Sequence, residues 1–379
     1  MTSFKRKATG RATLPSYPRT RISPASNLTL ITSTGISSLD DILGGGLPLS
    51  CSLVFAAPDV HSSYGELVQK YFVAQGLASG QRICVVGQNT ADFVGDIMWI
   101  SKSQVWNAPE SEEEDEGDAS QKVKIAWRYE KMKQFKTTVG DMNQNGESFC
   151  LPFELSSRVP REVIEEAVDK KMVQFVDSGR EGLSTSRVLG EISKELERDT
   201  TVPLRICIPG LGSAAWGNLT GQGMLYFLHS LKSLLHKHGH GCASISLAPE
   251  ISTSGWGGAG WMEKVGWATD GAVTISAFTA NPALSSIFPG HHGLVEIHRL
   301  PAPHTQSPPS DRFSTLRGLG TSGENNLAFK CTRKRLVFET LHLDVEGGTS
   351  ERRTPAAAAA KKTTTTTTKR RVVFEDNEF

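Results

Sequence analysis

The chain has 379 residues, of which 38% are hydrophobic, enough for one large folded domain or two smaller ones. Its formal net charge is +1, so the overall charge of the chain does not indicate which class of partner it binds. No apolar run approaches the roughly 20 residues that span a membrane, so we expect no membrane partner. Six cysteines without a C-x-x-C pair and no secretory apolar region favour a reduced compartment.

Charged residues are unevenly distributed along the chain. Residues 1–39 hold several basic side chains and no acidic one, whereas residues 110–118 (ESEEEDEGD) are almost wholly acidic. Such blocks are typical of solvated, disordered segments. We therefore predict a disordered basic tail over 1–28, an acidic insertion loop near 107–121, and a low-complexity disordered tail over 347–379, where AAAAA and TTTTTT lie among basic residues.

Strand-like and helix-like runs alternate between the two tails. A short helix is predicted after Thr34 or Ser37, and Gly44 to Gly46 would end it. Extended runs are predicted at 51–57, 81–87, 122–130, 204–210, 241–249, 271–278, 293–300 and 327–343. Helical spacing occurs at 65–78, 161–176, 184–199 and 224–238. This order predicts one α/β domain over 29–346, with a mainly parallel central sheet flanked by helices and antiparallel C-terminal strands.

The segment AAPDVHSSY lies between a predicted strand and a predicted helix, where a phosphate-binding loop has the pattern G-x-x-x-x-G-K-[ST]. In that pattern the glycines let backbone N–H groups face phosphates, the lysine reaches the outer phosphates, and the hydroxyl holds magnesium. Here Ala57 stands near the first glycine. Ser62 and Ser63 stand near the Gly-Lys pair, and Tyr64 near the hydroxyl. We interpret the segment as a degenerate nucleotide loop with the candidate residues Ala57, Pro58, Asp59, His61, Ser62, Ser63 and Tyr64.

The second half of such a site is an aspartate at the end of another buried strand. The run LRICIPG (204–210) has that character, but Pro209 occupies the position of the acid. Losing one charge-assisted contact costs roughly 1.5–3 kcal/mol of phosphate binding. We therefore predict no catalytic residue, no required cofactor and no ATP hydrolysis by the chain acting alone.

The run TSTGISSLDDILGGGLP (32–48), a buried strand and a degenerate loop together resemble the RecA/KaiC-like ATPase superfamily, in which TG-x-x-x-LD-x-x-L-GGGLP precedes the phosphate loop. Within that superfamily the chain resembles the PAXNEB family, the fourth subunits of the Elongator complex. The resemblance covers roughly residues 28–347. Its specific segments are KIAWRY (124–129) after an acidic insertion, the aspartate-free LRICIPGLGSAAW (204–216), and GLVEIHRLP (293–301) followed by AFKCTRKRLVFETLHL (328–343).

The resemblance implies a RecA-like domain without intact Walker motifs. It also implies a subunit that joins Elongator subunits 5 and 6 in a hetero-hexameric ring. That ring serves the catalytic Elongator subcomplex, binds tRNA and supports the modification of wobble uridines. The family ring is credited with nucleotide-dependent release of tRNA, so weak ATP binding in the ring is implied as well. The sequence offers no residue for that hydrolysis.

Two other functions remain open at this point. One is an atypical ATPase whose site is completed by a neighbouring ring subunit, as arginine fingers act in trans. The other is a nucleotide-sensing protein without RNA binding. The absence of both the lysine and the acid argues against the ATPase. A neighbouring subunit can supply an arginine, but it can hardly supply the rest of the phosphate-binding loop.

The segment STSGWGGAGWMEKVGW (252–267) follows a predicted core strand, where RecA-like rings carry central loops. Trp256, Trp261 and Lys264 could stack on RNA bases and pair with phosphates. Alternatively, the tryptophans could pack beneath their own loop, as large aromatic side chains more often do. The G-x-G-x-x-G within this segment lacks the second βαβ unit of a dinucleotide site, so we do not interpret it as one.

A basic aromatic segment, KVKIAWRYEKMKQFK (122–136), has the composition of a nucleic-acid contact. Its alternation also suits an ordinary strand with a solvated basic face, which we favour. The phosphate-contact candidates in it are Lys131, Lys133 and Lys136.

The cluster TRKRL (332–336) interrupts an apolar run with three basic residues, Arg333, Lys334 and Arg335. One interpretation is a strand edge that docks a partner or faces RNA. The other is a solvent-facing strand edge whose charges prevent it from pairing with other chains and aggregating. The segment HKHGHGC (236–242) follows a predicted helix, where histidines favour the helix dipole, and no second ligand cluster accompanies it. We therefore predict no metal site there.

Overall fold

The computed structural model of the chain describes residues 14–101, 148–178, 182–253, 255–279, 281–317 and 326–341. Residues up to Leu341 belong to one compact unit, and the second unit, His342–Phe379, lies outside the described residues. The predicted acidic insertion near 107–121 and the strand predicted at 122–130 also lie outside them. No helix among the described residues is long and apolar enough to cross a membrane.

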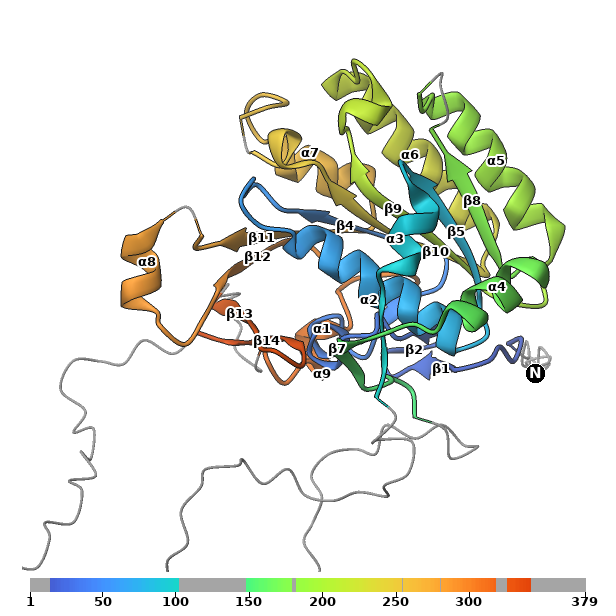
Figure 1. Cartoon of the computed structure of the whole chain (residues 1–379), viewed down its shortest axis with the longest axis horizontal. Helices are drawn as coiled ribbons and strands as arrows, with labels where there is room; N and C mark the ends of the chain where they lie inside the picture. Colours follow the sequence, from blue (N-terminus) through green and yellow to red (C-terminus); the bar gives the residue numbers. More distant parts are fainter. Residues whose placement is uncertain are drawn as a thin grey trace, which may run out of the picture. The chain divides into compact units, whose positions relative to one another are not determined.

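A nine-stranded sheet forms the centre of this unit (Figure 1). Six neighbouring strands are parallel, and the last three of the order, β12 to β14, are antiparallel additions. The predicted mainly parallel α/β fold with antiparallel C-terminal strands is therefore confirmed. In sheet order the strands are β14 (Leu336–Thr340), β13 (Leu327–Cys331), β12 (Gly293–Arg299), β11 (Gly271–Ala277), β4 (Ser52–Ala56), β10 (Gly241–Leu247), β9 (Leu204–Leu211), β5 (Arg82–Gly87) and β8 (Val173–Asp177).

Both faces of the sheet are buried, because successive side chains of a strand point to opposite faces. Leu53 and Phe55 of β4 belong to one hydrophobic cluster. Val54 and Ala56 belong to a second cluster on the other face. This is why the central strands are continuous apolar runs, as parallel sheets covered on both faces require.

Helices cover the two faces of the sheet (Figure 1). The first cluster contains residues of α2 (Tyr64–Ala78), which packs on β5, β9 and β10. The second contains residues of α5 (Thr185–Arg198), α6 (Gly221–Lys237) and α7 (Trp261–Ala268). At the start of α6, the Thr220 hydroxyl accepts a hydrogen bond from the amide of Gly223, which caps the helix.

Short elements complete the described chain. Two small antiparallel sheets consist of β1 (Thr20–Ser23), β2 (Ser26–Thr32) and β3 (Leu47–Pro48), and of β6 (Met98–Ile100) and β7 (Phe153–Arg158). The remaining helices are α1 (Ser37–Ile42), α3 (Thr90–Gly95), α4 (Arg161–Asp169), α8 (Pro282–Ile287) and α9 (Ser310–Phe313), with the 3-10 turns η1 (Ala214–Trp216) and η2 (Pro249–Ile251).

The structure corrects two predicted boundaries. The tail predicted over 1–28 is too long, because β1 and the start of β2 lie within it and pair with each other. The single extended run predicted over 327–343 is instead a hairpin, β13 and β14, whose turn is closed by a hydrogen bond from the Thr332 amide to the Arg335 carbonyl.

The helix predicted over 161–176 is also wrong in its second half. The helix α4 ends at Asp169, and Lys171 takes a left-handed conformation with φ of 56°. The next residues form β8, where Val173 pairs with Ile83 of β5. Pairing with the parallel sheet overrides the helical spacing, because β-branched side chains suit a strand whose neighbours are already in place.

A buried arginine connects the main sheet to the elements packed on it. Arg205 of β9 is fully buried. Its Nε donates to Gln81 at 2.6 Å, and its Nη2 donates to the Thr32 hydroxyl at 2.6 Å. Further bonds reach the carbonyls of Ser33 and Phe72, at 2.7 and 3.2 Å. The guanidinium carbon also lies 4.6 Å from the centre of the Phe72 ring. One cation therefore ties β2, α2 and the start of β5 to the centre of the sheet.

A buried carboxylate lies beside Ser33, one of the partners of Arg205. Asp40 of α1 accepts hydrogen bonds from the Ser33 hydroxyl at 2.5 Å and from the Thr34 amide and hydroxyl, both at 2.7 Å. Burial raises the pKa of Asp40 to about 6, although these hydrogen bonds oppose the shift. The side chain of Asp40 therefore holds the turn between β2 and α1.

Replacing Arg205 should strongly destabilise the fold. We expect Arg205→Ala to lower the free energy of unfolding by about 3–5 kcal/mol, because four buried acceptors lose their donor and a cavity remains. Urea unfolding followed by circular dichroism measures this change. The control Arg161→Ala removes a side chain that is 88% exposed, and it should change stability by less than about 0.5 kcal/mol. Equal effects of the two substitutions would contradict the role given to Arg205.

Asp40 should make stability depend on pH. The folded pKa of about 6 lies above the unfolded value of about 3.9, so the folded chain binds the proton more tightly. This stabilising contribution is complete below about pH 4 and is lost as the pH rises through about 6. Between pH 7 and pH 5, the wild-type free energy of unfolding should therefore rise by about 1 kcal/mol relative to Asp40→Asn. Urea unfolding of both proteins at pH 7, 6 and 5 tests this, and parallel pH profiles would refute it.

Candidate functional site

A cleft of about 1020 Å³ lies at the carboxyl ends of the central parallel strands. Ala57 lines it after β4, Gln88 after β5, Pro209 in β9 and Leu247 at the end of β10. Ligands of open α/β sheets bind at this edge of the sheet. The structure thus brings the predicted degenerate loop, the proline at the acid position and Trp256 to one cavity.

The loop is held by its own carboxylate, that of Asp59, which is not among the residues that line the cleft. The amide of His61 donates to Asp59 at 2.9 Å, and the hydroxyl of Thr279 donates to the other oxygen of Asp59 at 2.5 Å. Burial raises the pKa of Asp59, but these hydrogen bonds outweigh it and hold the pKa below its usual value. The amide of Ala57 donates to the hydroxyl of Ser252 at 3.1 Å. Two loop amides are therefore already occupied by side chains of the chain itself.

The start of α2 is closed by packing. The methyl group of Ala57 fills the base of the loop, because a Cβ added to Gly65 would lie 2.9 Å from it. The ring of Tyr64 packs edge-on against Phe329 of β13, with the centroids 4.6 Å apart, and does not serve as a hydroxyl ligand for magnesium. Ser63 lines the cleft at the position of the loop lysine, without an ammonium group.

The charged residues that line the cleft would repel a polyphosphate. The single lysine, Lys70, lies 2.9 Å from Glu66 and 2.6 Å from Asp96. Asp92 and Glu250 add two further carboxylates. Among the described residues that line the cleft, four are thus acids and one is a lysine, and the acid Asp96 is also paired with Arg158. Sequence reasoning missed this lining, because the acids come from α2, from α3 and its C-cap, and from η2, which the fold brings to one cleft.

The strand end that would hold magnesium has no acid. Pro209 lines the cleft at that position, and the amide of Gly210 donates to the Ser246 hydroxyl at 3.0 Å. Among the residues that the structure describes, no three His, Cys, Asp or Glu side chains are grouped to hold a metal ion. The cleft retains the place of a nucleotide site while its residues lack the chemistry.

The two tryptophans proposed to face RNA have different environments. Trp261 is 1% exposed, and its indole Nε1 donates to the carbonyl of Ile251 at 2.9 Å. Trp256 is 37% exposed, lines the cleft and packs edge-on against Trp261, with ring centroids 5.1 Å apart. Trp261 therefore packs in the core. Trp256 and the exposed Lys264 of α7 remain candidates for contact.

The other basic candidates do not line the cleft. Arg333, Lys334 and Arg335 form the exposed turn between β13 and β14. The carbonyl of Lys334 accepts a hydrogen bond from the Leu155 amide at 2.7 Å, which anchors the turn to β7. The remaining candidates lie outside the described residues: Lys131, Lys133 and Lys136.

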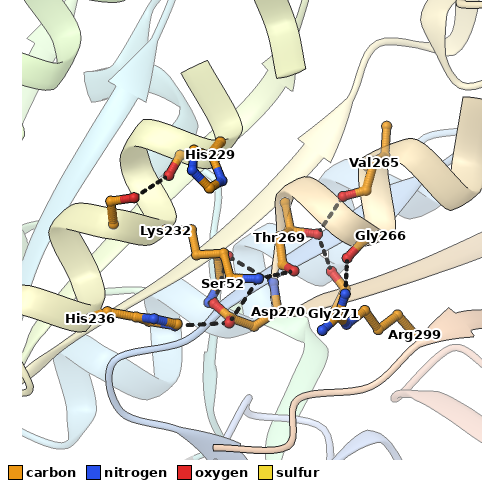
Figure 2. A network of polar contacts seen from close by, with 11 residues as sticks. Ser52, His229, Lys232, His236, Val265, Gly266, Thr269, Asp270, Gly271 and Arg299 are labelled. Carbon is orange, nitrogen blue, oxygen red and sulfur yellow. Dashed lines mark hydrogen bonds and ion pairs between the residues drawn. The ribbon is translucent and has the colours of Figure 1, made fainter. Parts of the chain in front are cut away.

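The histidine-rich end of α6 has a structural role (Figure 2). His236 lies 2.9 Å from Asp270, and Lys232 lies 3.6 Å from the same carboxylate oxygen. The second oxygen accepts bonds from the amide and hydroxyl of Ser52, at 2.9 and 3.1 Å. Burial raises the pKa of Asp270, but these partners outweigh it and keep the pKa below its usual value. The network joins α6 to the starts of β4 and β11.

Substituting each tryptophan in turn distinguishes the side chain that packs in the core from the side chain that is available for contact with a partner. We expect Trp261→Ala to lower the free energy of unfolding by about 3–5 kcal/mol, because a large buried ring and its hydrogen bond are lost. Trp256→Ala should cost less than about 1 kcal/mol, because its ring is partly exposed. Urea unfolding measures both. If Trp256→Ala proved as destabilising as Trp261→Ala, Trp256 would be a core residue as well.

Comparison with known proteins gives consistent matches along the chain. A model of the PAXNEB protein family matches residues 13–374. The chain is 29% identical to the Elongator complex protein 4 of Xenopus laevis over 377 residues, covering 90% of this chain and 86% of the relative. It is 26% identical to the protein of the same name in Dictyostelium discoideum, covering 84% of this chain and 76% of the relative. The corresponding human protein is also 26% identical, covering 83% of this chain and 77% of the relative.

Proposed function

The chain belongs to the PAXNEB family, and from this membership we propose that it is a non-catalytic, RecA-like subunit of the Elongator complex. In this proposal it joins subunits 5 and 6 in a hetero-hexameric ring in the cytoplasm and nucleus. The ring binds tRNA and supports wobble-uridine modification by the catalytic subcomplex. The names of its relatives, each an Elongator complex protein 4, support membership of the complex.

The cleft carries the non-catalytic part of the proposal. Hydrolysis of ATP needs a lysine on the outer phosphates, a hydroxyl and an acid for magnesium, and loop amides that are free to bind phosphate. Here Ser63 stands near the position of the lysine, Tyr64 near that of the hydroxyl and Pro209 at that of the acid. The amide of His61 donates a hydrogen bond to Asp59. The cleft therefore serves as a rigid part of the fold, and the chain requires no cofactor.

Completion of this site by a neighbouring subunit is the less favoured alternative. An arginine from a neighbour would bring one positive charge to a cleft where four carboxylates face one paired lysine. It would supply neither the magnesium ligand nor the loop lysine. Any weak binding of ATP in the ring is therefore expected at the sites of the other subunits.

The RNA-contact part of the proposal rests on exposed side chains of suitable chemistry. Trp256 presents part of an indole ring beside the cleft, and Lys264 lies exposed on the following helix. An aromatic ring and an ammonium group are the usual pair for stacking on a base and contacting a phosphate. The basic hairpin turn at Arg333 and Lys334 adds a second positive surface.

Native mass spectrometry tests the assembly. The chain would be measured alone and co-expressed with Elongator subunits 5 and 6, with tRNA added afterwards. We expect a mixed ring of six subunits that retains tRNA, and a loss of tRNA as salt rises, because phosphate contacts release counterions. A chain that ignores both partners and tRNA would refute the proposed function.

ATP hydrolysis by the assembled ring tests the inactive cleft. Rings containing Pro209→Ala or Ser63→Ala should hydrolyse ATP within about twofold of the wild-type ring, because neither side chain contributes to the reaction. Ser193→Ala, which changes a serine on the surface of α5, is the matched control. A tenfold loss in the Ser63→Ala ring alone would place catalysis in this cleft.

A further inference from the structure

A second cavity, of about 700 Å³, lies between α3, α4 and β8. These three elements pack on one another at one side of the sheet (Figure 1). Ile164 and Val168 of α4 and Phe175 of β8 form an apolar wall, and Val168 is 38% exposed although it faces this hollow. We call this cavity the α4–β8 groove.

The groove lies next to β8, which is the last strand of the main sheet in the part of the chain that the structure describes. At the opposite edge, the outer amides of β14 are closed by side chains: Leu336 donates to the Tyr71 hydroxyl at 3.1 Å, and Phe338 donates to Ser38 at 2.8 Å. At this edge β8 is the last strand, and no other described strand pairs with its outer side. Unpaired sheet edges are sites where another chain segment adds.

The rim of the groove is acidic. Asp92, Glu165 and Asp169 line it together with one basic residue, Arg161, whose guanidinium is bonded to Glu165 at 2.7 Å. Asp92 and Asp169 have no ion pair within the part of the chain that the structure describes. An apolar wall beneath unpaired carboxylates fits an extended segment that carries one large apolar side chain beside several basic ones.

Residues 1–13 have this composition. They read MTSFKRKATGRAT, with one aromatic residue, Phe4, directly before Lys5, Arg6 and Lys7, and with no acidic residue. They join the described chain at Leu14 and span at most about 45 Å when fully extended. We propose that residues 1–13 dock in the α4–β8 groove, with Phe4 against the apolar wall and the basic residues facing the acidic rim.

The inference is independent of the proposed RNA function. It assigns the basic segment to a protein surface, whereas its charge alone would equally suit a nucleic acid. The same contacts would serve docking on the chain's own groove and on that of a second copy. Attraction between exposed charges weakens within about 10 Å at 0.1 M salt, so docking should weaken as ionic strength rises.

Site-specific photo-crosslinking of the full chain tests this docking. Phe4 would be replaced by p-benzoylphenylalanine, the protein irradiated, and the linked peptides identified by mass spectrometry. We expect links to α4 or β8. Asp169→Lys, and separately Asp92→Lys, should lower their yield at least fivefold. The matched control Glu162→Lys changes an acid on the same helix outside the groove and should leave the yield within twofold.

Both rim substitutions are at exposed positions, and circular dichroism of each variant verifies that the fold is intact. Mixing isotopically labelled and unlabelled chains tells links within one chain from links between copies, and either result supports docking in the groove. Links to any other surface, links only to added tRNA, or yields unchanged by both rim substitutions would overturn the proposal.

Discussion

The buried guanidinium of Arg205 is the interaction on which the arrangement of the cleft depends. A cation without water must have acceptors on every side, and the chain supplies them from β2, α2 and the residue before β5. Because Arg205 lies in β9, these bonds set α2 relative to that strand. The start of α2 and the end of β9 both line the cleft, so the bond from Arg205 to Phe72, together with apolar packing, fixes their relative position.

Within that rigid frame, the chemistry of a nucleotide site has been replaced. The loop lies between β4 and α2, where Asp59 accepts a hydrogen bond from the His61 amide and the methyl group of Ala57 packs against Gly65. The carboxylates around Lys70 make the cavity unfavourable for phosphates. The described cleft therefore lies at the strand ends without the lysine of a phosphate-binding loop and without an acid at the end of β9.

Particular elements show how far the sequence could be interpreted. Strongly apolar strands such as β4, β5, β9 and β10 were predicted at the right places, because burial on both faces of the sheet demands continuous hydrophobic runs. The second half of the run 161–176 was predicted as helix and forms β8. A short amphipathic run is compatible with the period of a helix and with that of a strand, and pairing with a neighbouring strand determines which one forms. The hairpin at β13 and β14 was missed for a related reason, as a basic turn interrupts an otherwise continuous extended pattern.

The sequence by itself determined the alternating α/β order, the position of the degenerate loop, the proline at the acid position and the motifs that place the chain in its family. These are local features, readable from neighbouring residues. Only the tertiary structure decided that Trp261 is core while Trp256 is partly exposed, that Asp59 bonds to Thr279, and that Glu66 and Asp96 pair with Lys70. Burial and charge pairing depend on residues far apart in the chain, and only packing of the sheet brings them together.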